Sequence, residues 1–333
     1  MGQSITIAVL GANSFSGQDF VDLLLDNPWY KVIGISRSPE RSGLFLKYKQ
    51  RHDLSRYRYF EIDMNQAMPA LLELLDAERP EYIVNFAAQS EVAPSWEHPE
   101  QWFQTNCVAL ARLINHLRRR DYLRRYLHVS SPEVYGSCFG KVYEDAQINP
   151  STPYAASKAA ADMLLSTYAK QFRFPVVTVR STNVYGARQQ LHKIIPRSVI
   201  YMKLGKKIEL HGGGVSVKSY IHIRDVSRGE LAILERGRLG QVYHLSPENG
   251  VEVREMVRMI AKRLGYRFQD VTTLVDERPG QDAAYVIDST RARTDFGWTP
   301  QVNLKDGLSE VITWVEDNWR EIQEQPLEYQ HRT

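Results

Sequence analysis

Short apolar runs rich in β-branched residues recur along the first half of the chain, and amphipathic stretches separate them. The apolar runs span Ile5–Leu10, Val32–Ile35, Tyr82–Phe86, Tyr126–Ser130 and Val176–Arg180, and the stretches with helical spacing include Phe20–Leu25, Val108–Arg118 and Ala155–Tyr168. Alternation of this kind predicts a parallel sheet with helices on both faces. We expect an α/β fold built on a doubly wound parallel (Rossmann) sheet, with ligands at the carboxyl ends of the strands.

The alternation breaks down after Gly186, where Pro and Gly clusters and shorter strands follow. We interpret residues 1–186 as an NAD(P)-binding Rossmann domain. Residues 187–333 then form a smaller C-terminal substrate-binding lobe, with segments that return to the core. The polar residues 328–333 are expected to be disordered.

Charge and cysteine content narrow the class of protein. The chain has 42 basic and 39 acidic residues in 333, a balance that argues against a nucleic-acid partner. Two cysteines exclude a disulfide framework, and no His/Cys cluster suggests a metal site. No signal peptide and no membrane-spanning apolar run is expected, so the predicted location is cytoplasmic, without a membrane partner.

The first predicted strand is followed by a glycine-containing turn that opens a helix. Residues 11–17 read G-A-N-S-F-S-G, with glycine at the first and last positions and serine where a middle glycine is usual. A dinucleotide site needs glycine where the backbone turns tightly and the pyrophosphate approaches a helix N-terminus. The candidate cofactor residues in this turn are Gly11, Asn13, Ser14, Phe15, Ser16 and Gly17.

The end of the second predicted strand bears on the choice of cofactor. An NAD site usually has a carboxylate there, whereas this chain has Ser36 and Arg37. A guanidinium and hydroxyls would bind a 2′-phosphate through charge-assisted hydrogen bonds. The sequence therefore favours NADP, with NAD as the alternative. Asp63 follows another short strand and is a candidate partner for the adenine amino group.

Tyr154 and Lys158 stand four residues apart in a predicted helix, so they share one face. A nearby ammonium favours the phenolate and so lowers the pKa of a tyrosine. A phenolate can take the proton of a sugar hydroxyl while hydride leaves the same carbon. Ser130 and Ser131, at the end of an earlier apolar strand, complete a pattern typical of such an active site.

With these motifs in place, almost the whole chain resembles the extended short-chain dehydrogenase/reductase family, and specifically its nucleotide-sugar 4,6-dehydratases. The resemblance is carried by the N-terminal glycine turn, Asn85–Ser90, Asn106, Ser130–Gly136, Tyr154, Lys158, Arg180–Gly186, Lys218–Ile221 and Arg278–Asp282. It implies that Ser131 binds the C4 oxygen, Tyr154 is the base and Lys158 tunes that base. Further cofactor residues, in addition to Tyr154 and Lys158, would be Met64, Ala87, Ala88 and Gln89.

Glu133 separates the subclasses within this resemblance. Related 4-epimerases usually have a small or hydroxyl residue there, whereas a carboxylate two residues beyond Ser131 can reach C5 of the sugar. Once C4 is a ketone the C5 proton is acidic, and Glu133 can remove it before water leaves from C6. The expected activity is therefore a lyase reaction, a redox-neutral 4,6-dehydration of an NDP-hexose to an NDP-4-keto-6-deoxyhexose.

Two segments of the chain favour different nucleotides. Pro132 stands where dTDP-glucose 4,6-dehydratases usually have an acidic aspartate, and GDP-mannose 4,6-dehydratases resemble this chain better there. The segment Arg278–Asp282, in contrast, is more similar to the dTDP-glucose enzymes, and UDP-xylose synthases usually lack it. The residues expected to bind the NDP-hexose are Ser90, Asn183, Lys193, Lys218 and Arg278, with Arg278 as the bidentate diphosphate clamp.

Other readings of the same motifs stay open. The scaffold also supports a 4-epimerase, a decarboxylase or a 4-keto reductase, in which Glu133 has another role. A non-catalytic nucleotide-binding protein is a third class, against which the intact Ser131, Tyr154 and Lys158 argue. The two helices around residues 108–118 and 155–168 carry apolar and small residues, and related enzymes pair such helices, so we expect a homodimer through a four-helix bundle.

Overall fold

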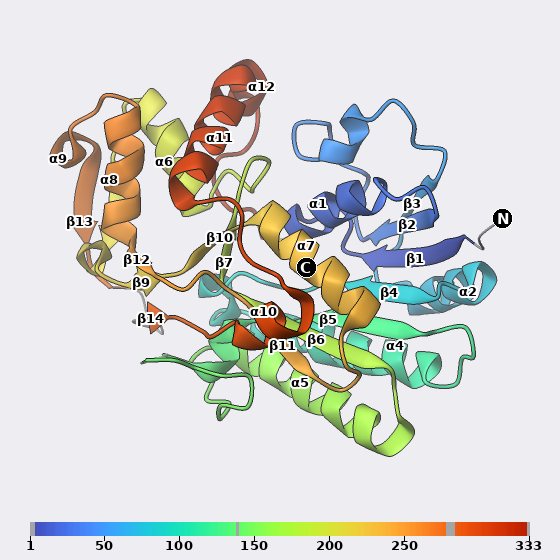
Figure 1. Ribbon diagram of the computed structural model, residues 1–333. Helices are drawn as coiled ribbons and strands as arrows, with labels where there is room; N and C mark the ends of the chain where they lie inside the picture. The colour runs from blue at the N-terminus through green and yellow to red at the C-terminus, as the bar shows by residue number, and fades with distance from the viewer. Residues whose placement is uncertain (1–3, 138–139, 278–283, 332–333) are drawn as a thin grey trace.

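A seven-stranded sheet forms the centre of the computed structural model, which describes residues 4–137, 140–277 and 284–331 (Figure 1). Every strand pair in it is parallel, and the strand order is β11-β6-β5-β4-β1-β2-β3. The strands are β1 (Ile5–Leu10), β2 (Tyr30–Ser36), β3 (Tyr57–Glu61), β4 (Tyr82–Asn85), β5 (Arg125–Val129), β6 (Val176–Ser181) and β11 (Val242–Leu245). The predicted doubly wound parallel sheet is confirmed.

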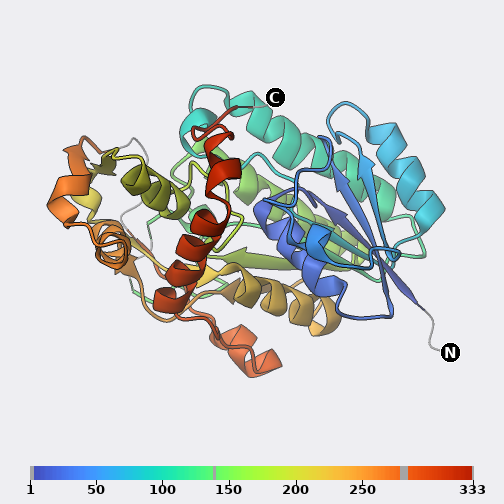
Figure 2. The same ribbon diagram turned by 90° about the horizontal axis from the view of Figure 1, so that it is seen from above.

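Strand β1 shows why helices must cover both faces of this sheet. Ile7 and Val9 point into one hydrophobic core, and Ala8 and Leu10 point into a second core on the other face. All four side chains are at most 2% exposed, which explains why the strand reads as a continuous apolar run. Figure 2 shows the two helical layers from above.

The helices divide between the two faces of the sheet. The first core receives side chains from α1 (Phe15–Leu24) and α7 (Ile223–Arg236), and the second from α2 (Met68–Glu78), α4 (Leu110–Leu117) and α5 (Pro153–Phe172). Shorter elements precede α4, namely α3 (Pro99–Phe103) and a π-helical segment, Gln104–Ala109. The predicted helix over 108–118 is therefore divided between this segment and α4.

A separate hydrophobic core fills the lobe at the left of Figure 1. It is built by α6 (Ile194–Lys203), α8 (Val253–Arg263), α11 (Leu304–Asp317) and α12 (Trp319–Gln323). Small sheets flank it: β7 (Asn183–Tyr185) with β10 (Tyr220–His222), β8 (Ile208–His211) with β13 (Thr272–Val275), and β9 (Val217–Lys218) with β12 (Val251–Glu252) and β14 (Ala284–Tyr285). The remaining helices are α9 (Phe268–Val271) and α10 (Thr290–Phe296).

Chain beyond Gly186 takes part in both regions, because α7 and β11 belong to the central layers. The predicted division at residue 186 stays a prediction. No helix in the described ranges has the length and apolar character needed to cross a membrane.

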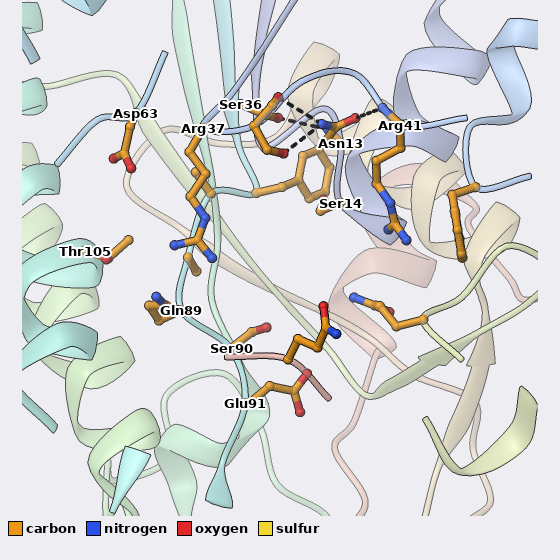
Figure 3. Close-up of a pocket in the computed structure, with 18 of the residues that line it drawn as sticks. Asn13, Ser14, Ser36, Arg37, Arg41, Asp63, Gln89, Ser90, Glu91 and Thr105 are labelled. Carbon is orange, nitrogen blue, oxygen red and sulfur yellow. Dashed lines mark hydrogen bonds between the residues drawn. The ribbon is translucent and has the colours of Figure 1, made fainter. Parts of the chain in front are cut away.

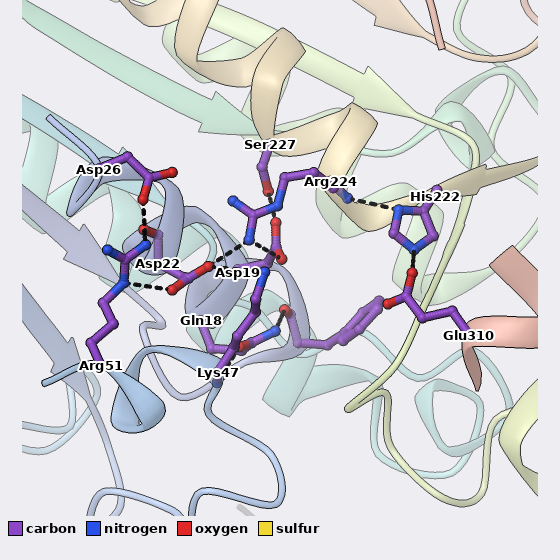
Figure 4. A network of polar contacts seen from close by, with 11 residues as sticks. Gln18, Asp19, Asp22, Asp26, Lys47, Arg51, His222, Arg224, Ser227 and Glu310 are labelled. Atoms are coloured by element: carbon purple, nitrogen blue, oxygen red, sulfur yellow. Dashed lines mark hydrogen bonds and ion pairs between the residues drawn. The ribbon is translucent and has the colours of Figure 1, made fainter. Parts of the chain in front are cut away.

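Ion pairs fasten α1 to α7 and to the neighbouring loop (Figure 4). The Arg224 guanidinium lies 2.5 Å from Asp22 and 3.1 Å from Asp19, and the Ser227 hydroxyl donates to Asp19 at 2.7 Å. Arg51 also pairs with Asp22, at 2.7 Å. Burial raises the pKa of Asp19, although Arg224 opposes that shift. The network fixes α1, whose N-terminus faces the site described next.

Candidate active site

A cavity of about 530 Å³ lies at the carboxyl ends of β1, β2 and β4. The strand order reverses between β1 and β4, and open α/β sheets bind their ligands at such a switch point. Predicted cofactor residues line the cavity, namely Gly11, Asn13, Ser14, Ser36, Arg37, Asp63, Met64, Ala87, Ala88 and Gln89, together with Ser90 from the predicted substrate set. Figure 3 shows several of these side chains around the cavity.

The two glycines of the first turn are required by close backbone contacts. Gly11 has a φ of +81°, and a Cβ there would lie 2.8 Å from the backbone nitrogen of Ala87. A Cβ on Gly17 would lie 2.2 Å from the carbonyl oxygen of Gly11. Ser14, at the middle position, is the N-cap of α1 and accepts a hydrogen bond from the Gly17 amide at 3.0 Å. The turn thus leads straight into a capped helix N-terminus.

Asn13 organises the loop that follows β2. Its side-chain amide donates to the Pro39 carbonyl at 2.8 Å and to the Tyr59 hydroxyl at 2.9 Å, and its oxygen accepts from the Arg41 amide at 3.1 Å. Its backbone amide donates to the Ser36 hydroxyl at 3.0 Å. These bonds hold a loop from which Arg37 and Arg41 both point into the cavity (Figure 3).

Arg41 is a cavity residue that the sequence analysis did not include among the candidates. Its guanidinium lies 3.7 Å from the centre of the Phe45 ring, and both residues line the cavity. A guanidinium stacked on an aromatic face is fixed in orientation. The sequence does contain one indication that Arg41 belongs to the site. It lies four positions after Arg37 in the same loop, so both side chains can reach the same ligand.

Asn106 connects the cavity wall to helix α5. Its side chain exchanges two hydrogen bonds with the backbone of Gln89, at 2.9 and 3.0 Å, and donates to the Ser157 hydroxyl at 2.9 Å. Ser157 lies on α5 between Tyr154 and Lys158. The neighbouring Thr105 lines the cavity. The Ala87–Ser90 segment is therefore linked by the hydrogen bonds of Asn106 to α5, which carries Tyr154 and Lys158.

Ser131, Glu133 and Tyr154 come together beside this wall. Ser131 caps the 3₁₀ turn Pro132–Tyr135, and its hydroxyl accepts from the Glu133 amide at 3.2 Å. Burial and the Glu133 carboxylate raise the pKa of Tyr154, and a hydrogen bond with Ser131 opposes that rise. A hydroxyl, a carboxylate and a phenol thus meet at one point, where they can serve proton transfers at neighbouring carbons.

Lys158 differs from its expected arrangement. Its ammonium donates to the Val129 carbonyl at 2.7 Å, and burial lowers its pKa to about 8. The spacing of the two residues predicts that Lys158 lowers the pKa of Tyr154, whereas in the structure burial raises that pKa. The reason is that Tyr154 is buried beside the Glu133 carboxylate, and both burial and a nearby negative charge disfavour the phenolate.

Among the residues that the structure describes, the remaining predicted cofactor and substrate residues do not line the cavity. Phe15, Ser16 and Gly17 belong to α1, and Phe15 is buried. Asn183 is exposed on β7, Lys218 is buried on β9, and Lys193 precedes α6 and pairs with Glu91 at 2.6 Å. Arg278 lies outside the described residues. The roles assigned to all of these stay predictions.

Glu91 is a second residue that the sequence did not reveal. It lines the cavity and lies 3.2 Å from His192 as well as 2.6 Å from Lys193. Burial alone would raise its pKa, but the Lys193 ammonium and the contact with His192 outweigh it and lower the pKa to about 2. Its side chain thus carries a fixed negative charge at the wall, opposite the basic loop after β2.

The C-terminal segment also lines the cavity, through Gln325, Pro326, Glu328, Tyr329 and Gln330. His331 stacks on Trp102 and His98, with ring centres 5.5 and 5.4 Å apart, and bonds Gln101 at 2.6 Å. The expected disorder of residues 328–333 is therefore wrong for Glu328–His331. Aromatic partners on another part of the chain, which composition alone does not show, hold this segment in place.

Comparison with known proteins agrees with this geometry. Residues 9–311 match the family model described as GDP-mannose 4,6 dehydratase. The chain belongs to this family. The dTDP-glucose 4,6-dehydratase of Streptomyces niveus is 31% identical over 331 residues, which cover 97% of this chain and 96% of that protein. The resemblance to extended short-chain dehydrogenases/reductases that act as NDP-sugar 4,6-dehydratases is confirmed.

A solved structure and a plant protein extend the comparison. The structure of DesIV (dTDP-glucose 4,6-dehydratase) from Streptomyces venezuelae, with NAD and TYD bound, has a TM-score of 0.87 and 29% identity, covering 94% of this chain and 98% of that one. The trifunctional UDP-glucose 4,6-dehydratase/UDP-4-keto-6-deoxy-D-glucose 3,5-epimerase/UDP-4-keto-L-rhamnose-reductase RHM2 of Arabidopsis thaliana is 30% identical over 319 residues. The match covers 94% of this chain and only 47% of the plant protein's length.

Proposed function

We propose that the protein is an NDP-hexose 4,6-dehydratase, a lyase that converts an NDP-hexose to an NDP-4-keto-6-deoxyhexose. The observation that carries the proposal is the meeting of Ser131, Glu133 and Tyr154, in which the Ser131 hydroxyl bonds both other residues. The family match and the Streptomyces relatives support it. An epimerase needs no carboxylate at position 133.

The residues around the cavity suit a dinucleotide. The turn at Gly11 has no room for a Cβ, and it leads into the capped N-terminus of α1, where a pyrophosphate can approach the backbone. The residues that would hold it are those of the glycine turn, the loop after β2, Asp63 and the Ala87–Gln89 wall. When bound, the nicotinamide would supply the hydride acceptor and donor that this redox-neutral reaction needs.

The residues of the chain then handle the protons. Tyr154 takes the proton of the C4 hydroxyl, and Ser131 binds the C4 oxygen. Glu133 removes the C5 proton, which the C4 ketone has made acidic, and passes a proton to the C6 hydroxyl so that water leaves. C5 takes up a proton when C6 becomes a methyl group, which balances the proton that Tyr154 took from the C4 hydroxyl. Pro132 has no acidic group, so Glu133 serves as both base and acid. General acid–base help of this kind contributes about 10²–10⁴ in rate.

We propose NADP rather than NAD as the cofactor. Arg37 and Arg41 point into the cavity from one loop, with the Ser36 hydroxyl beside them (Figure 3). Two guanidiniums and no carboxylate at the end of β2 suit a 2′-phosphate. The DesIV relative was solved with NAD, so the basic loop is where this chain would differ from it.

A panel of GDP-, dTDP-, UDP- and CDP-hexoses tests the activity. Mass spectrometry of each incubation should show, for one nucleotide class, a product that has lost the mass of one water. An unchanged mass with altered stereochemistry at C4 would instead identify an epimerase. The same panel decides between GDP sugars, which the Pro132–Glu133 pair favours, and dTDP or UDP sugars, which the Arg278–Asp282 segment favours.

A further inference from the structure

A buried ion pair lies directly behind the proposed catalytic residues. Arg180, on β6, donates from Nη2 to the Asp162 carboxylate at 2.7 Å and from Nε at 3.2 Å. The Asp162 side chain is 6% exposed and that of Arg180 is 4% exposed. Neither is placed against the cavity wall, so the pair is available for a role other than direct ligand binding.

The pair contacts both ends of the turn that carries Ser131 and Glu133. The Ser130 hydroxyl donates to Asp162 at 2.7 Å, at the residue just before Ser131. Arg180 donates to the Tyr135 hydroxyl, two residues beyond Glu133, and its guanidinium lies 4.7 Å from the centre of the Tyr135 ring. One ion pair thus holds the turn before its serine and after its glutamate.

Two further hydrogen bonds join Tyr135 to His244 and His244 to the Asp288 carbonyl, and the donor in each can be assigned. The Tyr135 hydroxyl lies 2.7 Å from Nε2 of His244, and Nδ1 of His244 lies 3.0 Å from the Asp288 carbonyl. Burial and Arg180 lower the pKa of His244 to about 3, so the ring is neutral. Nδ1 must carry the proton to donate to a carbonyl, which leaves Nε2 to accept from Tyr135. Tyr135 can therefore accept from Arg180 and donate to His244 at once.

Helix α5 places the acidic half of the pair beside the other catalytic residues. Tyr154, Lys158 and Asp162 follow each other at intervals of four, so they lie along one helix face. Lys158 donates to the carbonyl of Val129, which immediately precedes Ser130. The helix and the turn are therefore joined by two adjacent contacts, one from Lys158 and one from Asp162.

The free-energy cost of burying two charges argues that this ion pair holds the geometry of the site rather than stabilising the fold. Removing two charges from water costs about as much as their attraction returns, and apolar residues of similar volume often stabilise a core equally well. His128 also lies beside Asp162, with Nε2 3.5 Å from the carboxylate, and burial lowers its pKa so that it stays neutral. Arg180 is thus a cation that donates two hydrogen bonds to Asp162.

We propose that Asp162 and Arg180 are positioning residues that hold the Ser131–Glu133 turn against the Tyr154–Lys158 face of α5. This inference rests on the catalytic roles proposed above. Ser130 anchors the serine end of the turn and Tyr135 anchors the glutamate end. Loss of either anchor should displace one catalytic group and leave the other in place.

Two conservative variants test the two anchors separately. Tyr135→Phe removes only a hydroxyl and should release the Glu133 end, so that elimination slows by up to about 10²-fold and reduced cofactor accumulates with substrate. Ser130→Ala should release the Ser131 end, so that the first hydride transfer slows and reduced cofactor appears slowly. KM for the substrate should change little in both, because each residue acts through its contact with the Asp162–Arg180 pair and has no proposed contact with the substrate.

Tyr243→Phe is the matched control. Tyr243 is fully buried on β11 and bonds Arg238 and Asp295, away from the turn. It should lower the melting temperature by an amount similar to Tyr135→Phe while kcat stays at the wild-type value. If Tyr135→Phe and Ser130→Ala also keep wild-type kcat and lose only thermal stability, the positioning role is refuted.

A pH profile gives a second measurement on Asp162→Asn. The Asp162 carboxylate raises the pKa of Lys158 against burial, so its loss should shift the alkaline limb of kcat to lower pH. An unshifted limb in a folded Asp162→Asn enzyme would contradict the proposal. Failure of the proposed function is distinguishable, because the wild type would then dehydrate no NDP-hexose in the panel, whatever the variants do.

Discussion

Single side chains decide the chemistry at the proposed active site. Ser131 accepts from the Glu133 amide and bonds Tyr154, so the position of one hydroxyl sets the place of two proton-transfer groups. Glu133 in turn helps to raise the pKa of Tyr154 through its negative charge. The roles of these residues can therefore be separated by variants that stop the reaction at different steps.

Glu133→Gln should keep hydride transfer at C4 and block elimination. The amide cannot remove the C5 proton, so turnover should fall by about 10²–10⁴-fold while substrate reduces the bound cofactor. The measurement is near-ultraviolet absorbance of the reduced nicotinamide, with mass spectrometry for the 4-keto-6-deoxy product. Tyr154→Phe is the matched comparison and should give no reduced cofactor. Normal turnover by Glu133→Gln would make an epimerase or reductase the better assignment.

Arg37→Asp should reverse the cofactor preference. Loss of one charge-assisted contact should weaken NADP binding by about 1.5–3 kcal/mol, while NAD improves relative to it. Titration of both cofactors measures the ratio. Lys31→Asp makes the same charge change at the exposed opposite end of β2 and should leave the ratio unaltered. Equal binding of NAD and NADP by the wild type would refute the reading of Arg37.

Among the elements, α5 has the greatest influence on the site, since it carries Tyr154, Lys158 and Asp162. Its N-cap is Thr152, whose hydroxyl accepts from the Ala155 amide at 3.1 Å, and Pro153 occupies the first helical position. The Tyr154 amide is held separately by the Ser95 hydroxyl, at 3.2 Å. These contacts in the first turn of the helix thus fix the backbone position of Tyr154.

Thr152→Ala should cost about 1 kcal/mol of folding stability and also lower kcat, because the uncapped first turn contains Tyr154. Asn303→Ala removes the comparable cap of α11, whose side chain accepts from the Asp306 amide at 2.9 Å in the lobe. It should cost a similar free energy with no change in kcat. Denaturant unfolding measures the loss of stability in both variants, and steady-state kinetics measures kcat. An equal kcat in the two variants would show that the Thr152 cap does not affect catalysis.

For the whole molecule, the C-terminal segment joins parts of the chain that are distant in sequence. Gln325, Pro326 and Glu328–Gln330 line the cavity together with Arg37 and Glu91, and His331 stacks on Trp102 of α3. Tyr329 packs edge-on against His192, with ring centres 5.3 Å apart. The segment therefore covers one side of the cofactor cavity.

Deleting residues 325–333 should speed cofactor dissociation by about tenfold, the equivalent of roughly 1.4 kcal/mol of lost contacts. Stopped-flow displacement of the bound dinucleotide measures the rate. His331→Ala is the companion variant, since it removes the stacking anchor and leaves the cavity-lining residues in the chain. His331→Ala should increase the rate of cofactor dissociation by a smaller factor than the deletion does. An unchanged dissociation rate in the deletion variant would show that the segment does not retain the cofactor.

The homodimer stays a prediction, and it can be tested at apolar side chains that are exposed on neighbouring elements. Phe103 and Val108 are 37% and 41% exposed beside α5, which exposes Met163 at 55%. Val108→Glu combined with Met163→Glu should give a monomer in light scattering at micromolar concentration. Leu274→Glu, at an exposed position of β13, should leave the dimer intact. A wild-type monomer would refute the prediction.

Local patterns in the chain were enough to predict the architecture and the main chemical groups. Periodicity predicted most strands of the central sheet, because a strand buried on both faces must be continuously apolar, as Ile7–Leu10 are, but it did not predict β11. The G-x-x-S-x-x-G turn and the Tyr154–Lys158 spacing are local patterns, so they could be recognised without a fold. The boundaries were less exact, since α1 begins at Phe15, before the predicted stretch.

Which distant residues meet depends on how the whole chain packs. Glu91, Thr105 and the C-terminal segment join the cavity through loops whose paths no local pattern encodes. The Asp162–Arg180 pair likewise depends on β6 lying beside β5 and under α5. Burial, a property of the packed chain, reversed the expected direction of the Tyr154 pKa. Local spacing fixes which groups share an element, but desolvation and long-range contacts exist only once the elements pack.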